Sequence, residues 1–271
     1  MTAMVEKKMQ ETPAQSAPII SLKGVSKTFS NGTVALNNMS LDIRQGEFVS
    51  LLGPSGCGKS TALRIVTNLT GPTSGKVEWP QERANQKEHE LSFVFQEPTL
   101  MPWATVFANV WLPLRLKGLS RKDAEDRVME ALQMVGLDQF AKSYPRELSG
   151  GMKMRVSIAR ALVTKPKVLL MDEPFAALDE ITRFKLNNDI LNLWETFGWT
   201  VIFVTHSVFE SVYLSNRIVV MAARPGRVVN DMPIDAPYPR DESFRTSSVY
   251  AGFCRDVSGA LHAAMGSGEE H

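Results

Sequence analysis

The N-terminal part of the chain alternates apolar and polar residues on either side of Asn31-Gly32. This alternation predicts two half-buried strands, and Asn-Gly is the strongest short signal for the turn of a β-hairpin. The next apolar run, residues 47–52, is short and continuous, which indicates a buried strand. A glycine-rich loop follows, and apolar residues then recur at helical spacing over residues 63–69. The order strand, loop, helix is therefore expected.

From about residue 101 to residue 165 the pattern becomes mostly helical. Ser120 with Asp123 predicts a capping box at the start of one helix, and Gly136 stands where its C-cap is expected. Residues 81–90 are polar and predict an exposed loop. Strand patterns resume at 167–172, 200–206 and 217–222, separated by a helical stretch. Alternating strands and helices favour a mainly parallel sheet into which a helical lobe is inserted.

Composition indicates which class of protein, partner and compartment to expect. Hydrophobic residues make up 44% and charged residues 22%, as in globular proteins, and the net charge of +1 gives no reason to expect a nucleic-acid partner. The two cysteines, Cys57 and Cys254, fit a reducing compartment. The first twenty residues lack a signal-peptide pattern, and every apolar run is far shorter than a membrane span. We expect a cytoplasmic protein whose membrane role, if any, comes through a partner.

The loop "GPSGCGKST" matches the phosphate-binding pattern G-x-x-x-x-G-K-[ST] in full. Its glycines let backbone N–H groups approach phosphate oxygens at a helix N-terminus, Lys59 would reach the β- and γ-phosphates, and the Ser60 hydroxyl would ligate Mg²⁺. A plain glycine-rich turn is the alternative, and the flanking strand and helix argue against it. The residues expected to hold the nucleotide are Gly53, Pro54, Ser55, Gly56, Cys57, Gly58, Lys59, Ser60 and Thr61.

Two carboxylates follow the apolar run in "VLLMDEP". They stand at the carboxyl end of a predicted strand, where ligands bind in open α/β sheets. Asp172 would hold Mg²⁺, directly or through water, and Glu173 would position or deprotonate the attacking water. A simple strand-ending turn is the alternative. With the glycine loop these residues indicate a nucleotidase or a kinase without choosing between them.

The segment "LSGGM" predicts a second anion site. Ser149 can cap a helix, and Gly150 and Gly151 leave the first N–H groups of that helix unobstructed. With the glycine loop upstream and "VLLMDEP" about twenty residues downstream, it resembles the ATP-binding-cassette ATPases over roughly residues 19–230.

That resemblance implies an α/β fold: a P-loop NTPase core with a mainly parallel sheet, an N-terminal antiparallel β subdomain and an inserted α-helical lobe. It implies ATP and Mg²⁺ as cofactors. It also implies two copies packed head to tail, with Ser149 and Gly151 of one copy contacting the γ-phosphate held by Lys59 of the other.

Further positions match the family one at a time. Phe29 matches the aromatic that stacks on adenine, with a hairpin-core residue as the alternative. Gln96 matches the glutamine that touches Mg²⁺ and water and links the nucleotide to the helical lobe. Asp179 matches the loop along the dimer seam. His206 matches the histidine that contacts the γ-phosphate, although a lone histidine at a strand end is usually structural.

Residues 95–114, "LSGGM" and residues 219–229 resemble the nitrate, sulfonate and taurine class of bacterial importers. This implies membrane permease subunits as partners, a solute-binding protein acting indirectly, and a place at the cytoplasmic face of the plasma membrane. Trp103, Phe107 and Trp111 stand four residues apart, which is a helical spacing. They are expected either to pack in the core or to form an interface with the permease. Met152 and Ser207 replace the family's usual Gln and Asp, which bears on subfamily more than on activity.

The resemblance divides the chain into a flexible tail (1–18), a cassette domain (19–235, with the lobe at about 101–165) and a short helical tail (236–271). Two other classes of function stay open from the residues alone. A soluble cassette ATPase acting on nucleic acid or ribosomes usually has tandem cassettes or a coiled-coil insertion, and this chain has no sustained heptads. A P-loop kinase would leave "LSGGM" and His206 unexplained.

Overall fold

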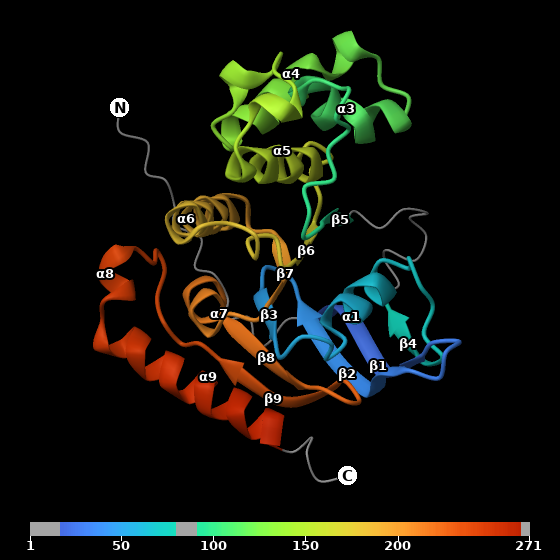
Figure 1. Cartoon of the computed structure of the whole chain (residues 1–271), viewed down its shortest axis with the longest axis vertical. Coiled ribbons are helices and arrows are strands. Elements are labelled where there is room, and N and C mark those ends of the chain that lie inside the picture. The colour runs from blue at the N-terminus through green and yellow to red at the C-terminus, as the bar shows by residue number, and fades with distance from the viewer. Residues whose placement is uncertain (1–16, 80–90, 267–271) are drawn as a thin grey trace.

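The computed structural model describes residues 17–79 and 91–266, so the predicted loop at 81–90 and most of the predicted N-terminal tail lie outside it. The strands are β1 (Pro18–Thr28), β2 (Val34–Arg44), β3 (Phe48–Leu52), β4 (Ser74–Glu78), β5 (Leu91–Val94), β6 (Val168–Asp172), β7 (Thr200–Thr205), β8 (Arg217–Ala222) and β9 (Arg227–Pro233). The helices are α1 (Lys59–Val66), α3 (Val106–Leu116), α4 (Arg121–Met134), α5 (Gly150–Leu162), α6 (Glu180–Phe197), α7 (Val208–Leu214), α8 (Glu242–Arg245) and α9 (Ser248–Gly266), with 3-10 turns at Asp138–Phe140 and Pro145–Glu147. Figure 1 shows α3, α4 and α5 as a lobe above a body that holds both sheets.

The N-terminal sheet has the strand order β2-β1-β4, and both of its pairings are antiparallel. The predicted hairpin is present: Thr28 pairs with Val34, and the turn between them places Gly32 at φ +83°. This left-handed conformation is one that glycine adopts without steric cost. Strand β4 was not predicted, because its short polar sequence carries no alternation and its partner, β1, is distant in the chain.

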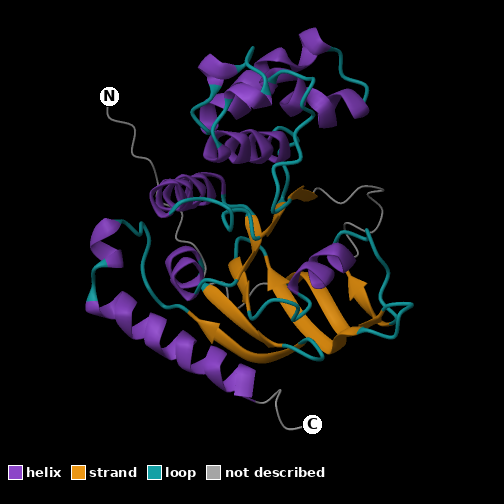
Figure 2. Ribbon diagram, viewed as in Figure 1, coloured by secondary structure: helices purple, strands orange, loops and turns teal. Residues whose placement is uncertain are grey.

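The main sheet has the order β5-β6-β7-β3-β8-β9, parallel throughout except for the final β8–β9 pair. Every residue of β3, β6 and β7 is buried, as expected for parallel strands covered on both faces. Figure 2 shows the strands gathered in the body and only helices and loops in the lobe. The three central strands run in one direction, so their carboxyl ends, at residues 52, 172 and 205, lie at one edge of the sheet.

The helical lobe has an apolar core formed where α3 packs against α4 and α5. The Ser120 Oγ accepts the Asp123 N–H at 3.3 Å and caps α4, while the Asp123 carboxylate accepts from the Ser120 hydroxyl rather than from a backbone N–H. The predicted capping box is therefore half formed. Gly136 follows the end of α4 at φ +68°, as a helix-ending glycine does.

The three aromatic residues around α3 do not share one environment. Trp103 precedes the helix in a turn and is 77% exposed, whereas Phe107 is 6% exposed in the lobe core. Trp111 is half-buried and donates its indole N–H to the Leu119 carbonyl at 3.2 Å. The three residues therefore do not share one helix face, because the helix begins only after its N-cap, Thr105. Phe107 is a core residue, and Trp103 is a surface residue.

The C-terminal helices pack on the body, with α9 lying against α7 and β8. The buried Arg240 joins this segment to the end of α7, since its guanidinium donates to the carbonyls of Val212, Tyr213 and Ser215 at 2.8, 3.1 and 2.9 Å. A cation is favourable at the carboxyl end of a helix. Across residues 17–79 and 91–266, none of the helices combines the length and the apolar character needed to cross a membrane.

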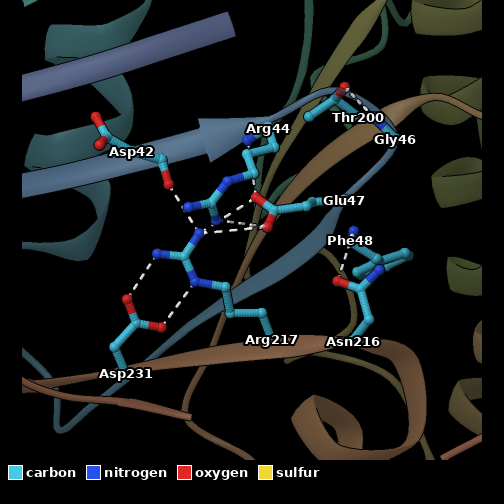
Figure 3. A network of polar contacts seen from close by, with 9 residues as sticks. All are labelled: Asp42, Arg44, Gly46, Glu47, Phe48, Thr200, Asn216, Arg217 and Asp231. Carbon is cyan, nitrogen blue, oxygen red and sulfur yellow. Dashed lines mark hydrogen bonds and ion pairs between the residues drawn. The ribbon is translucent and has the colours of Figure 1, made fainter. Parts of the chain in front are cut away.

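A network of charges ties the two sheets together at the amino ends of the central strands (Figure 3). The buried Glu47 carboxylate accepts from Arg217 at 3.2 Å and from Arg44 at 3.4 Å. Arg217 also donates to both carboxylate oxygens of Asp231, at 2.7 and 2.6 Å, and to the Asp42 carbonyl at 2.8 Å. Arg217 therefore links β2, β8, β9 and the residue that precedes β3.

We expect Arg217→Met to lower the free energy of unfolding by about 3 kcal/mol, because it leaves the buried Glu47 carboxylate without the closer of its two arginine side chains. Arg44→Met is the matched control: its side chain is 31% exposed against 15% for Arg217. Its loss should be about 1 kcal/mol or less. Urea unfolding of the two variants measures the difference, and equal losses would contradict the central place of Arg217.

Candidate functional site

The glycine loop connects β3 to α1 and packs closely against neighbouring backbone. A Cβ on Gly53 would lie 2.6 Å from the Met221 carbonyl oxygen, and one on Gly58 would lie 2.6 Å from the Ala35 carbonyl oxygen. Gly58 also has φ +89° and is the N-cap of α1. Only glycine fits at these two positions. The backbone N–H groups at the start of α1 are thereby presented in the arrangement that binds phosphate.

Lys59 is the first residue of α1 and is buried. Its ammonium donates to the Gly53 carbonyl at 2.7 Å and to the Pro54 carbonyl at 3.0 Å, and it lies 3.6 Å from the Glu173 Oε1. The ammonium is thus held over the loop by neutral acceptors. A phosphate oxygen is a stronger acceptor, because hydrogen bonds between charged groups are stronger than those to neutral ones.

Ser60 and Asp172 meet across the gap between α1 and the end of β6, where the Ser60 hydroxyl donates to the Asp172 Oδ1 at 2.8 Å. Asp172 is only 8% exposed, and burial raises its pKa, opposed by the Ser60 hydrogen bond. A hydroxyl and a carboxylate are hard oxygen ligands of the kind that Mg²⁺ prefers. These residues therefore fit a Mg²⁺ site.

The other ligands of this Mg²⁺ would be phosphate oxygens and waters. Among residues 17–79 and 91–266, no three His, Cys, Asp or Glu side chains gather closely enough to hold a metal ion. Protein-bound Mg²⁺ usually has one or two carboxylates and completes its octahedron with phosphate oxygens and waters. The site thus fits a metal that arrives together with a nucleotide.

Glu173 is held in an unusual backbone conformation, with φ +46° and its N–H donating to the Val204 carbonyl at 3.0 Å. Left-handed backbone at a non-glycine residue is uncommon and is concentrated at functional sites. The Glu173 Oε2 lies 3.0 Å from the His206 Nδ1, which comes from the end of β7. The carboxylate thus bridges His206 on one side and Lys59 on the other.

Phe29 and Gln96 stand outside this cluster of contacts. Phe29 is exposed at the hairpin turn, with the Lys27 ammonium 5.5 Å from its ring centre, so it is not a hairpin-core residue. Gln96 is exposed just after β5, on the connection that leads into the helical lobe. Both side chains are accessible to a ligand, and their predicted roles stay predictions.

The "LSGGM" residues meet the loop of Asp179 at a second place. The Ser149 Oγ caps α5 by accepting the Met152 N–H at 3.3 Å, and Gly150 follows it. A Cβ on Gly151 would lie 2.5 Å from the Thr182 Cγ2 in α6. The Asp179 Oδ1 accepts the Thr182 N–H at 2.9 Å and caps α6. These helix starts adjoin one another, whereas Figure 1 shows α5 in the lobe, apart from α1 in the body.

Glu210, which contacts the residue before His206, was not identified from the sequence. Glu210 is 8% exposed, its Oε2 accepts the Thr205 hydroxyl at 2.6 Å, and burial raises its pKa. The S-x-x-E pattern of Ser207 to Glu210 is a capping-box signal that could have drawn attention to it. Its carboxylate binds the Thr205 hydroxyl instead, a tertiary contact that the pattern does not encode.

Comparison with known proteins now identifies the family, because residues 36–176 match the ABC transporter family. The chain belongs to that family. Its cassettes bind and hydrolyse ATP, so the predicted fold class, nucleotide and ATPase activity are confirmed. The P-loop kinase alternative is not favoured.

Individual relatives of this ABC protein agree with that assignment. The aliphatic sulfonates import ATP-binding protein SsuB of Bacillus cereus is 47% identical over 227 residues, which cover 83% of this chain and 89% of SsuB. An uncharacterized ABC transporter ATP-binding protein of Methanocaldococcus jannaschii, MJ0412, is 46% identical over 231 residues, covering 85% of each chain.

Two solved structures share the fold. The dimeric structure of the bacterial ABC transporter cassette MJ0796 has a TM-score of 0.70 and 37% identity, covering 80% of this chain and all of that one. The cbiO1 protein of Clostridium perfringens, part of the cbiONQ transporter complex, has a TM-score of 0.73 and 26% identity, covering 91% of this chain and 98% of its own.

We expect Asp172→Asn to raise the melting temperature of the cassette at pH 7 without nucleotide or metal. The raised pKa means that folding favours the protonated carboxyl, so its ionisation at neutral pH weakens the fold. Each kcal/mol relieved would raise the melting temperature by about 2–4 °C. The gain should shrink as the pH falls through the folded-state pKa, below which the wild-type carboxyl is also neutral.

Asp179→Asn is the matched control for this measurement. The hydrogen bond from the Thr182 backbone lowers the pKa of Asp179, so its charge favours the folded state above the ordinary pKa of an aspartate. The control should therefore lower the melting temperature at pH 7. A melting temperature that falls in Asp172→Asn would contradict the destabilising effect of that carboxylate.

Proposed function

We propose that this chain is the ATP-binding and ATP-hydrolysing subunit of an importer for a small solute such as a sulfonate, nitrate, taurine or a related molecule. One observation carries the proposal: Lys59, Ser60, Asp172, Glu173 and His206 converge at one edge of the sheet. The similarity to SsuB supports import as the work that hydrolysis drives. A nucleic-acid partner has no support in the net charge of +1.

ATP would bind with its β- and γ-phosphates on the N–H groups of residues 53–61 and its adenine against the exposed ring of Phe29. The Lys59 ammonium would exchange the loop carbonyls for phosphate oxygens. Ser60, Asp172 and Gln96 are the residues that would hold Mg²⁺, which supplies charge neutralisation at the phosphates when bound. For Ser60 and Asp172, this role is supported by the proximity of their side-chain oxygens. The Ser60 Oγ lies 2.8 Å from the Asp172 Oδ1.

Glu173 is suited to accept a proton from the attacking water. As the water oxygen forms its bond to the γ-phosphorus and the bond to the β-phosphate oxygen breaks, the carboxylate takes the proton. The His206 Nδ1, 3.0 Å away, fixes the carboxylate's direction. Its ring can then meet the γ-phosphate with its other nitrogen. Both side chains lie at strand ends, which limits their motion.

A second copy would complete each site. Ser149 and Gly151 lie at the start of α5, apart from α1 of the same chain in Figure 1, so a γ-phosphate that they contact would be held by another copy. Asp179, whose cap joins the same corner, would lie along the seam between the copies. The dimeric MJ0796 cassette shows that a relative assembles in pairs.

Glu173→Gln tests this arrangement. The amide keeps the shape of the side chain but cannot accept the proton, so ATP should bind, remain intact and hold two copies together. Gel filtration with ATP and Mg²⁺ should then show a dimer, and phosphate release should be lost. Lys59→Ala is the control, since it removes the main phosphate counterion and should give neither a dimer nor hydrolysis.

A Glu173→Gln variant that binds ATP yet stays monomeric, both alone and within the assembled transporter, would contradict the shared site. Wild-type turnover in Lys59→Ala would contradict the assignment of the glycine loop. Each result addresses a separate part of the proposal.

The membrane partners are permease subunits, with a solute-binding protein acting through them. From these partners we infer a position at the cytoplasmic face of the plasma membrane. Between the lobe and the body lies a groove of about 800 Å³ whose apolar lining includes Phe95, Leu112 and Leu116. Gln96 directly follows Phe95, so a permease helix in the groove would lie next to a predicted nucleotide ligand. Trp103 offers a second exposed anchor before α3.

In chain order, we keep the division into a tail (1–18), a cassette domain (19–235, with the lobe at about 101–165) and a helical C-terminal segment (236–271). Helices α8 and α9 fall in the last of these. The place of the lobe in this division is supported by the packing of α3, α4 and α5 against one another.

We expect Trp103→Ala to leave the cassette folded and able to bind ATP while weakening its assembly with the permease, since aromatic anchors often cost about 2 kcal/mol or more on truncation. Phe107→Ala is the matched control, because the 6% exposed ring lies in the lobe core. It should lose about 3–5 kcal/mol of stability. Thermal unfolding and co-purification with the permease separate the two effects, and unchanged assembly in Trp103→Ala would remove this residue from the interface.

A further inference from the structure

A closed set of hydrogen bonds fixes the backbone on both sides of His206. The Glu210 Oε2 accepts the Thr205 hydroxyl at 2.6 Å, and the Thr205 Oγ1 accepts the Ser207 N–H at 3.0 Å. The Ser207 Oγ accepts the Glu210 N–H at 3.3 Å. The residues immediately before and after His206 are therefore both bound to Glu210. These bonds hold the two residues that flank His206.

The other carboxylate oxygen of Glu210 faces a different element. Its Oε1 lies 3.6 Å from the Arg183 Nε in α6, and the Arg183 Nη2 donates to the Leu178 carbonyl at 3.0 Å. Leu178 is the residue directly before Asp179. Arg183 thus contacts both the loop that carries Asp179 and the carboxylate that holds the His206 backbone.

The pair is close but not hydrogen bonded. Neither the Arg183 Nε nor the Glu210 Oε1 has another hydrogen-bond partner, and their separation exceeds the usual 2.7–2.9 Å of a charge-assisted bond. A cavity of about 460 Å³ between α6, α7 and the C-terminal helices is lined by both residues. The pair therefore has both the unused bonding capacity and the room to tighten when α6 and α7 move.

Stability alone does not explain a carboxylate at this position. Replacing a buried ion pair by apolar residues of similar volume is often neutral or stabilising. Burial is substantial here, since Glu210 is 8% exposed. Glu210 is costly to bury, is hydrogen bonded to Thr205, and lies 3.6 Å from the arginine that holds the Asp179 loop. Its presence is better explained by what it positions.

We propose that Glu210 is a positioning residue for ATP hydrolysis: through Thr205 it directs His206 toward Glu173, and through Arg183 it couples that direction to the Asp179 loop. This rests on the proposed function, in which Asp179 faces the second copy. Docking of that copy would move the Asp179 loop, and Arg183 would transmit the change to Glu210. Hydrolysis would then follow only when both copies are in place.

The test uses the full chain with ATP and Mg²⁺, with turnover expressed per nucleotide-binding site counted by a fluorescent ATP analogue. Glu210→Gln and the isosteric Thr205→Val should each lower kcat per site by about tenfold or more while KM and analogue affinity change by less than about twofold. Thr205→Ser keeps the hydroxyl and should retain the wild-type kcat. A role in folding alone would lower the number of sites but not kcat per site.

Glu47→Gln is the matched control. Glu47 is also a buried glutamate with an arginine partner, but it lies at the amino ends of the strands, at the opposite edge of the sheet. It should lose stability and keep kcat per site. Equal losses of kcat in Glu47→Gln and Glu210→Gln would overturn the proposal.

A double variant tests the coupling to Arg183. Arg183→Met alone should lower kcat, and Arg183→Met with Glu210→Gln should be no slower than the slower single variant, because residues acting as a unit are non-additive. Losses that multiply would overturn the link, as would wild-type kcat per site in Thr205→Val. Failure of the wild-type chain to hydrolyse ATP would instead refute the proposed function, so the two failures are distinguishable.

Discussion

The parallel pairing of three strands is the constraint on which the site depends. Strand β7 pairs with β3 on one side and with β6 on the other, all in the same direction. The glycine loop that leads to Lys59 follows β3, and His206 follows β7. Asp172 is the last residue of β6, and Glu173 comes directly after it. Segments more than a hundred residues apart in the chain are thereby brought within hydrogen-bonding distance, as Ser60 and Asp172 are at 2.8 Å. Because the strands are buried on both faces, their ends have little freedom to move apart.

The two ends of the parallel strands differ in how their buried carboxylates are compensated. At the amino edge, Glu47 is surrounded by Arg44 and Arg217, so a buried charge is compensated within the protein. At the carboxyl edge, burial raises the pKa of Asp172, and the hydrogen bond from its closest partner, the Ser60 hydroxyl, only partly opposes this. The first arrangement favours the fold, and the second leaves binding energy for a cation. Such a division between stabilising and strained regions is common in enzymes, because groups arranged for catalysis are often suboptimal for stability.

Local sequence patterns predicted those parts of the molecule that depend on neighbouring residues. The hairpin turn at Asn31-Gly32 and the succession of strand, glycine loop and helix follow from short-range signals, and all are present. Strand β4 was missed because its pairing with β1 supplies the order that its polar sequence lacks. The exposure of Trp103 could not be predicted from spacing, since the same spacing fits a helix that starts only at Val106, three residues after Trp103. Glu210 was missed because its partners, Thr205 and Arg183, are chosen by tertiary packing.

Helix α6 is the element through which these parts communicate. Its start adjoins α5, where Gly151 leaves space for Thr182, and further along Asp189 pairs with Arg155 of α5 at 2.5 Å. Its other side faces α7, where Arg183 approaches Glu210. A movement of the lobe therefore cannot leave α6 unchanged, because a charged contact and a close steric contact would both be disturbed. Packed helices shift between discrete arrangements rather than deform continuously. The lobe that carries the signature residues and the strand end that carries His206 are thus joined by one helix held from both sides.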